Sequence, residues 1–274
     1  MFNPSNFLGS LQRYVPTKLL NVYSDTASFQ ISTSQTERCV LEALSVGYRS
    51  IDTAQCYYNE TEVGRPVRPS GVAGNEIFVT TKLWGGQGYA DTVRSIDQSL
   101  RRLDMDYIDL LLIHEPSGDY KEIYRAMEDA LLVGKLRSIG VANFLDGTYE
   151  DLINRCRIIP AVNQIETHPF RQQDKMQKLC REYGTNMEAW SPLACGKNGI
   201  FHNPVLTSIA DAHGKRVAQV VLRRLYQRNI VIIPKSTHRE RMVENLSILD
   251  FSLKDEEMSF IATLDKGKSL FNWW

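Results

Sequence analysis

The chain has 274 residues, and its 32 lysines and arginines balance 32 aspartates and glutamates, so the formal net charge is zero. This balance gives no sign of a nucleic-acid partner or an anionic membrane surface. The five cysteines are widely spaced without a C-x-x-C pair, which argues against a disulfide framework or structural zinc and favours a reducing cytoplasm. No signal peptide or membrane span is expected, because the N-terminal residues contain no long apolar run.

Apolar runs and amphipathic segments alternate along the chain. The runs typical of buried strands are 50–52, 77–81, 107–113, 136–141, 161–165, 186–190 and 230–233, and an eighth strand is expected within 23–29. The helices are predicted at 35–46, 91–103 with Asp91 as cap, 120–133, 148–155, 173–183, 204–213, 217–227, 239–249 and 254–264. This alternation predicts an α/β fold, a single (β/α)8 TIM barrel over residues 1–274, with its active site at the C-terminal ends of the strands.

Three polar residues stand where two neighbouring strands are predicted to end. Asp52 closes one strand, Lys82 follows the next, and Tyr57 lies in the polar loop 55–59. A desolvated cation beside a phenol favours the phenolate and lowers the pKa of the tyrosine. Such a tyrosine could donate a proton near neutral pH. The alternative interpretation is an ordinary surface ion pair and a loop tyrosine.

Polar residues also follow the other predicted strands: His114, Asn143, Gln164, Trp190, Lys235 and Ser236. Each has a structural explanation when taken alone. His114 could close a strand, Asn143 could cap a helix, and Gln164 could bond to a neighbouring loop. Because the carboxyl ends of all the strands meet at one mouth of a barrel, their convergence favours a single site.

The segments GYRSIDTAQCYYNE and TKLW resemble the signature of the aldo-keto reductases, barrel enzymes that reduce carbonyls with a nicotinamide cofactor. YIDLLLIHEP, IGVANF, VNQIETHP, AWSPL and IPKSTHRERMVENLSILDF resemble further family segments in family order, across roughly residues 36–265. The resemblance implies reversible NADPH-dependent reduction of an aldehyde or ketone to the alcohol, with tyrosine as general acid. It places the catalytic tetrad at Asp52, Tyr57, Lys82 and His114.

The resemblance also implies where NADPH/NADP+ would bind. The nicotinamide contacts fall on Asn143, Gln164 and Trp190, and the pyrophosphate contacts on Ser191 and Leu193. The 2′-phosphate contacts fall on Lys235, Ser236 and Arg241, and the adenine contacts on Glu244 and Asn245. The candidates for the substrate pocket are Trp84, Tyr58 and Phe144 beside His114, together with Trp190 and the C-terminal residues 271–274. No metal is expected, because the phenol supplies the acid.

The chain departs from the family pattern at three places. Asp25 and Ala27 stand where the family has the glycines of a GxGT-F/W segment, and Ala142 stands where many relatives carry serine. The N-terminal segment 1–22 is atypical. The expected partner is a small-molecule carbonyl substrate, with no nucleic acid and no membrane, for a monomer in the cytoplasm. Two alternative functions are an aldolase with Lys82 as Schiff-base nucleophile and a barrel that senses redox state or nucleotides.

Overall fold

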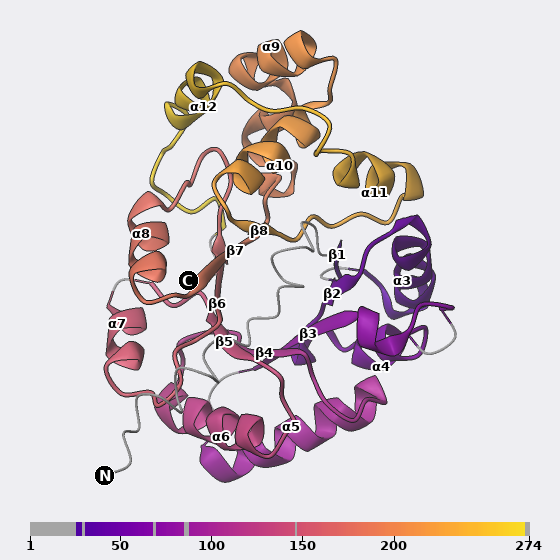
Figure 1. Ribbon diagram of the computed structural model, residues 1–274, viewed down its shortest axis with the longest axis vertical. Helices are drawn as coiled ribbons and strands as arrows, with labels where there is room; N and C mark the ends of the chain where they lie inside the picture. Colours follow the sequence, from indigo (N-terminus) through magenta and orange to yellow (C-terminus); the bar gives the residue numbers. More distant parts are fainter. Residues whose placement is uncertain (1–25, 29–30, 68–69, 85–87, 146, 272–274) are drawn as a thin grey trace.

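The computed structural model describes residues 26–28, 31–67, 70–84, 88–145 and 147–271. One curled sheet of eight parallel strands forms its centre, and each strand pairs with the next along the chain. The strands are β1 Thr26–Ala27, β2 Ser50–Asp52, β3 Phe78–Leu83, β4 Leu110–Ile113, β5 Ile139–Ala142, β6 Val162–Glu166, β7 Asn186–Trp190 and β8 Val231–Ile232. The helices lie outside the sheet (Figure 1), so the predicted (β/α)8 barrel is confirmed.

The helices follow the strands in the expected alternation. They are α3 Thr33–Val46, α4 Glu60–Gly64, α5 Tyr89–Leu103, α6 Tyr120–Leu132, α7 Thr148–Ile153, α8 Asp174–Glu182, α9 Pro204–His213, α10 Val217–Gln227, α11 Arg239–Leu246 and α12 Asp255–Ala262. The sequence analysis missed α4, because five residues are too few to show helical periodicity. It also misplaced the cap of α5, because Gly88 is the N-cap. Asp91 lies in the first turn, where its negative charge interacts favourably with the positive end of the helix dipole.

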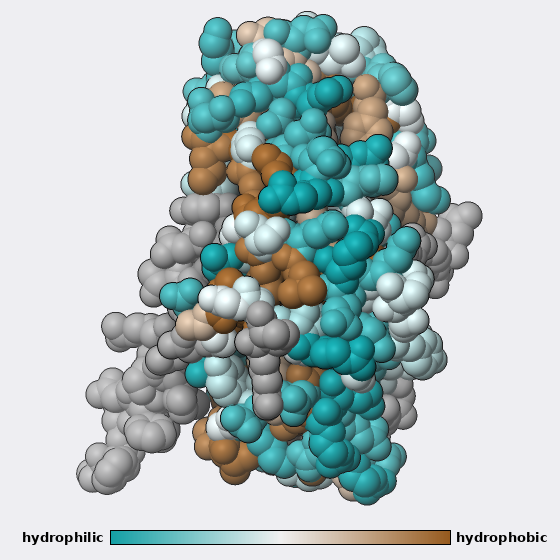
Figure 2. Space-filling model, turned by 90° about the vertical axis from the view of Figure 1, so that its right-hand side faces the viewer, coloured by the Kyte–Doolittle hydropathy of each residue, from teal (hydrophilic) through white to brown (hydrophobic). Residues whose placement is uncertain are grey.

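An early helix and a late helix of the chain meet where α3 packs against α11 (Figure 1). The hydroxyl of Tyr48, directly after α3, donates a hydrogen bond to the carbonyl of Met242 in α11 at 3.3 Å. The guanidinium of Arg38 reaches the carbonyl of Thr237 at 3.4 Å. The exposed face on this side of the molecule is mostly hydrophilic, with scattered apolar groups (Figure 2). No helix among the described residues is long and apolar enough to cross a membrane.

The interior of the sheet changes from apolar to polar along the strands. Phe78, Leu110 and Val162, early in their strands, belong to one buried apolar cluster. Lys82 and Gln164 come later in β3 and β6 and are also buried. Because side chains of a strand alternate between its two faces, residues two or four positions apart share the inner face. The apolar layer therefore forms a packed floor, and the polar groups collect above it at the carboxyl ends.

Gly64 is a place where the fold tolerates no side chain. A Cβ added there would collide with the backbone of Leu103 at the end of α5. We expect Gly64→Ala to lower the free energy of unfolding by about 1–3 kcal/mol or more, as overpacking does. Gly74→Ala is the matched control, because a Cβ at Gly74 meets no atom within 4 Å. Urea unfolding of the two variants should separate them, and equal stability would contradict the close approach of α4 and α5.

Candidate active site

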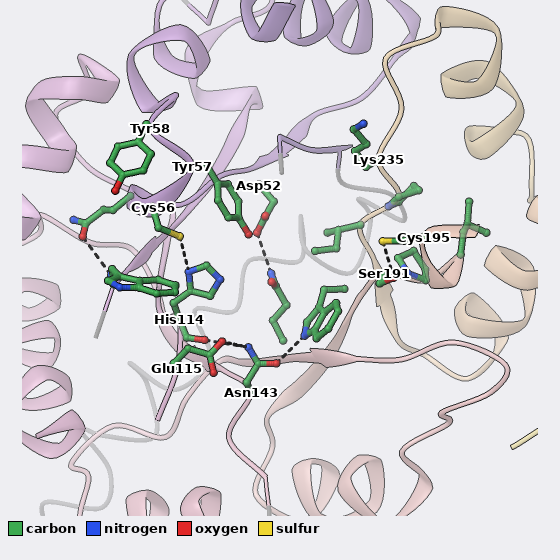
Figure 3. A pocket seen from close by; sticks show the side chains of 18 residues that line it. Asp52, Cys56, Tyr57, Tyr58, His114, Glu115, Asn143, Ser191, Cys195 and Lys235 are labelled. Carbon is green, nitrogen blue, oxygen red and sulfur yellow. Dashed lines mark hydrogen bonds between the residues drawn. The ribbon is translucent and has the colours of Figure 1, made fainter. Parts of the chain in front are cut away.

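A cavity of about 890 Å³ opens at the carboxyl ends of the strands (Figure 3). The sequence-predicted residues that line it are Asp52, Tyr57, Tyr58, Trp84, His114, Asn143, Gln164, Trp190, Ser191, Leu193 and Lys235. These residues come from loops and strand ends far apart in the sequence, and the barrel brings them to one mouth. The cavity therefore lies at the carboxyl ends of the strands, where the sequence analysis expected the site.

Lys82 and Asp52 form a buried ion pair beneath this cavity. Both side chains are almost fully buried, and Nζ of Lys82 donates to Oδ1 of Asp52 at 2.5 Å and to the carbonyl of Thr53 at 2.9 Å. Burial lowers the pKa of Lys82, but the charge and hydrogen bond of Asp52, together with Tyr57 and Glu188, raise it by more in sum, so the net shift is upward. The lysine is therefore a fixed cation at neutral pH. Its Nζ lies 5.1 Å from the centroid of the Tyr57 ring.

Tyr57 ends the short 3₁₀ helix Gln55–Tyr57, and Tyr58 after it has left-handed backbone angles. Figure 3 shows the ring of Tyr57 turned into the cavity beside Asp52. Burial raises the pKa of Tyr57 to about 12, although Lys82 lowers it. The sequence analysis named the effect of the lysine correctly but was wrong about the net direction, because desolvation of the phenolate is the larger contribution.

His114 is a neutral group at this site. Burial, and then the charge of Lys82, lower the pKa of its imidazole to about 3. The ring meets Tyr57 and Trp84 edge to face, with centroids 5.7 and 5.2 Å away. Nδ1 lies 3.4 Å from Sγ of Cys56, whose pKa burial raises to about 11. The thiol is therefore protonated at neutral pH, and when it donates to Nδ1 the ring proton lies on Nε2.

Two amide side chains are locked by their neighbours. Nδ2 of Asn143 donates to the carbonyl of His114 at 3.1 Å and to Oε1 of Glu115 at 2.7 Å, and its Oδ1 accepts from Nε1 of Trp190 at 2.8 Å. Nε2 of Gln164 donates to Oδ2 of Asp52 at 2.9 Å and to Oε1 of Glu188 at 2.5 Å. These partners fix which end of each amide faces which neighbour.

The sequence analysis did not assign the two acids that hold these amides, Glu115 and Glu188. Burial raises the pKa of Glu115 to about 8, against a smaller lowering by Asn143. Burial, and then Asp52, raise the pKa of Glu188 to about 7. Both positions carry a usable signal: Glu115 directly follows His114, and Glu188 lies two residues before Trp190, on the same face of its strand.

A second cavity of about 990 Å³ adjoins the first, and the two share Leu193, Cys195 and Lys235. Its lining includes the four remaining predicted cofactor residues, namely Ser236, Arg241, Glu244 and Asn245. Among the described residues, neither Lys235 nor Arg241 takes part in an ion pair. The start of α11 also opens here, and a helix N-terminus together with two cations is a favourable place for a phosphate.

Two residues predicted for the substrate pocket, Phe144 and Phe271, line neither cavity. Phe144 is not a cavity wall: it is fully buried in the core outside the barrel, where its ring meets Tyr120 edge to face at 5.2 Å. The left-handed backbone at Asn143, with φ of 63°, turns the chain directly before it. Phe271 is buried and packs at a tilt on Trp190, with centroids 5.1 Å apart. Asp25 and residues 272–274 lie outside the described residues.

The fold and the arrangement of its cavities place the chain among the (β/α)8-barrel proteins, and its relatives define the family. The model of the Aldo/keto reductase family matches residues 24–266. The glyoxal reductase of Bacillus subtilis is 46% identical over 231 residues, which are 84% of this chain and 83% of that protein.

Two solved structures agree with this match. An aldo-keto reductase from a Medee basin deep-sea metagenome library superposes with a TM-score of 0.89 at 39% identity, covering 91% of this chain and 93% of the other. An aldo-keto reductase of Bombyx mori, solved in complex with NADP, superposes with a TM-score of 0.86 at 32% identity, covering 92% and 91%. The chain therefore belongs to the aldo/keto reductase family of oxidoreductases.

Proposed function

We propose that the protein catalyses the reversible, NADPH-dependent reduction of an aldehyde or ketone to the alcohol. The observation that carries this proposal is the placement of the Tyr57 phenol beside the buried Lys82–Asp52 pair, under a cavity large enough for a substrate. A proton donor, a fixed cation and a neutral imidazole meet there, and reduction of a carbonyl needs a proton for the developing alkoxide.

The two adjoining cavities fit a nicotinamide dinucleotide. The cation-bearing end would hold the 2′-phosphate through Lys235, Ser236 and Arg241, with Glu244 and Asn245 at the adenine. Ser191 and Leu193 would contact the pyrophosphate, and Asn143, Gln164 and Trp190 the nicotinamide. NADPH, when bound, supplies the hydride. Two observations support this assignment: Lys235 and Arg241 line the second cavity, and a solved relative contains NADP.

Tyr57 is the general acid in this proposal. Its pKa of about 12 keeps it protonated at neutral pH, which is the form needed for reduction. When the proton moves to the substrate oxygen, the phenolate left behind is stabilised by Lys82, and Asp52 keeps that lysine charged and in place. His114 donates from Nε2 to the carbonyl oxygen and so orients the substrate and stabilises its growing negative charge.

A Schiff-base aldolase is disfavoured by the ion pair. Lys82 is fully buried against Asp52 and its pKa is raised, so an unprotonated amine is scarce at neutral pH. Borohydride trapping of a lysine adduct would reveal such a reaction. A sensor that retains the cofactor cavity would instead bind NADPH without steady turnover.

The test of the proposed function is NADPH oxidation against a panel of carbonyl compounds, repeated with NADH. The panel begins with glyoxal, because a relative with 46% identity is a glyoxal reductase. Steady oxidation with at least one carbonyl supports an enzyme, and binding without turnover across the panel contradicts it. We further propose a monomeric, cytoplasmic protein, which gel filtration and cell fractionation would test.

Arg241→Ala tests the preference for NADPH. A charge-assisted contact to phosphate is worth about 1.5–3 kcal/mol, so NADPH should bind roughly ten- to a hundredfold more weakly, with NADH nearly unchanged. Arg94→Ala is the matched control, because Arg94 is an exposed residue of α5 that lines neither cavity. Titration of both cofactors by fluorescence measures the difference. An equal loss for NADPH and NADH would remove Arg241 from the 2′-phosphate site.

A further inference from the structure

Glu115 is an acid that lines the first cavity and has no part in the mechanism proposed above. It follows His114 at the end of β4, and its side chain is half-buried. One carboxylate oxygen accepts the hydrogen bond from Asn143, and the other has no hydrogen-bond partner among the described residues. No described cation pairs with it: burial is the larger influence on its pKa, and the Asn143 amide opposes it.

The other charged groups of this cavity are compensated or stand apart. Asp52 is neutralised by Lys82, and Figure 3 shows Lys235 across the cavity from Glu115, at the border of the second cavity. The groups that face Glu115 from the neighbouring elements carry no charge at neutral pH: the His114 imidazole, the Cys56 thiol and the Asn143 amide. Among the residues that the structure describes, the substrate side of the cavity therefore contains one acid without a counter-ion.

An exposed aromatic ring stands on the same side. Trp84 is 52% exposed, lines the cavity, and meets the His114 ring edge to face. Aromatic faces attract cations, and an aromatic ring combined with a carboxylate is a suitable environment for an ammonium group. A carboxylate of a ligand placed there would face like charge and lose its hydration.

We propose that Glu115 selects substrates by charge: it favours carbonyl compounds with a cationic nitrogen near the carbonyl group and disfavours those with a carboxylate there. This inference rests on carbonyl reduction at Tyr57 and His114, because it assigns a substrate class to that reaction. The free oxygen of Glu115 pairs with the cation, while Asn143 holds the other oxygen and fixes the carboxylate in the cavity.

The selection depends on pH in a defined direction. Burial raises the pKa of Glu115 to about 8, so the carboxyl is mostly protonated below that pH and ionised above it. The preference for a permanent cation therefore increases as the pH rises. A bound cation stabilises the carboxylate and moves this increase to lower pH.

The test compares three para-substituted benzaldehydes: the cationic trimethylammonio, the neutral tert-butyl and the anionic carboxy compound. The first two are close in shape but differ in the reactivity of the carbonyl, and that difference cancels when the ratio of their kcat/KM values is compared between variant and wild type. The change in this ratio therefore measures the effect of charge. At about pH 9, where most of Glu115 is ionised in the wild type, we expect Glu115→Gln, which keeps an oxygen for the Asn143 amide, to lower the cationic-to-neutral ratio about ten- to a hundredfold. The anionic-to-neutral ratio should rise. Glu256→Gln, an exposed residue of α12, removes the same charge far from the cavity and should leave both ratios unchanged.

Each other outcome is decisive. An equal loss for all three aldehydes would show that Glu115 only positions Asn143, and would overturn the charge selection while carbonyl reduction stands. A cationic-to-neutral ratio in the wild type that is flat between about pH 6 and 9 would overturn it without any variant. No NADPH oxidation with any of the three, or with the wider carbonyl panel, would overturn the proposed function and this inference together.

Discussion

Replacing Tyr57 with phenylalanine is expected to lower kcat by about two to four orders of magnitude, the usual range for a lost general acid. The ring would keep its edge contact with His114, so the cavity keeps its shape. Affinity for NADPH should stay within a few-fold of wild type, because none of the proposed cofactor contacts is removed. Stopped-flow reduction of a panel aldehyde measures the chemical step, and fluorescence titration measures cofactor binding.

Tyr183→Phe is the control for this variant. Tyr183 lies at the end of α8, is 39% exposed, and does not line either cavity. The substitution Tyr183→Phe removes the same hydroxyl group from a place where no proton transfer is proposed, so turnover should be unchanged. Substantial turnover in Tyr57→Phe would contradict the assignment of Tyr57 as the general acid.

The positions of the strands could be predicted because both faces of each strand are buried. LLLI in β4 and IGVA in β5 read as apolar runs that end at a polar residue. Their carboxyl ends were correct to within about one residue, whereas their starts were predicted about three residues too early. Once the strands are parallel neighbours, Asp52, Lys82 and His114 must meet at the same rim. The sequence therefore predicted the members of the cluster well.

What the sequence could not show was the local environment of each side chain. The net pKa of Tyr57 depends on how much of the phenolate hydration is lost, and only the packed cavity sets that quantity. Phe144 was assigned to the cavity because it follows a strand end, but a left-handed Asn143 turns the chain before it. Glu115 appeared as a loop residue because its partner, the Asn143 amide, is 28 positions away.

Lys82→Met tests the coupling between the lysine and the phenol. The sequence analysis expected the lysine to lower the pKa of Tyr57, but burial raises that pKa to about 12 with the lysine present. Without Lys82, burial and the charge of Asp52 both raise the pKa of Tyr57, so it should rise further in the variant. Alcohol oxidation needs the phenolate as base, so its rate should fall in proportion to the fraction of Tyr57 present as phenolate.

The pH dependence of kcat/KM for alcohol oxidation shows in which direction the pKa of Tyr57 changes. Below the pKa of Tyr57 the phenolate fraction rises with pH, so the rate rises in wild type and the whole curve moves to higher pH in Lys82→Met. Reduction should also suffer, because a weaker acid donates its proton less readily to the alkoxide. Asp52→Asn keeps the lysine but removes the carboxylate that raises the pKa of Lys82 against the effect of burial. The lysine is then held less firmly in its charged form and stabilises the phenolate less, so we expect a milder form of the same profile.

Lys82→Met also leaves the Asp52 carboxylate buried without its cation, which by itself destabilises a protein by about 3–5 kcal/mol. The double variant Asp52→Asn/Lys82→Met separates the two effects, because it removes both charges and the cost of an unpaired one. If the lysine acts through the pKa of Tyr57, the double variant regains stability in urea unfolding but its oxidation profile stays displaced to higher pH. The displacement is smaller than in Lys82→Met, because the charge of Asp52 no longer raises the pKa of Tyr57. An oxidation profile in Lys82→Met with an unchanged basic limb would mean that the lysine does not tune the tyrosine, and proton transfer would need another explanation.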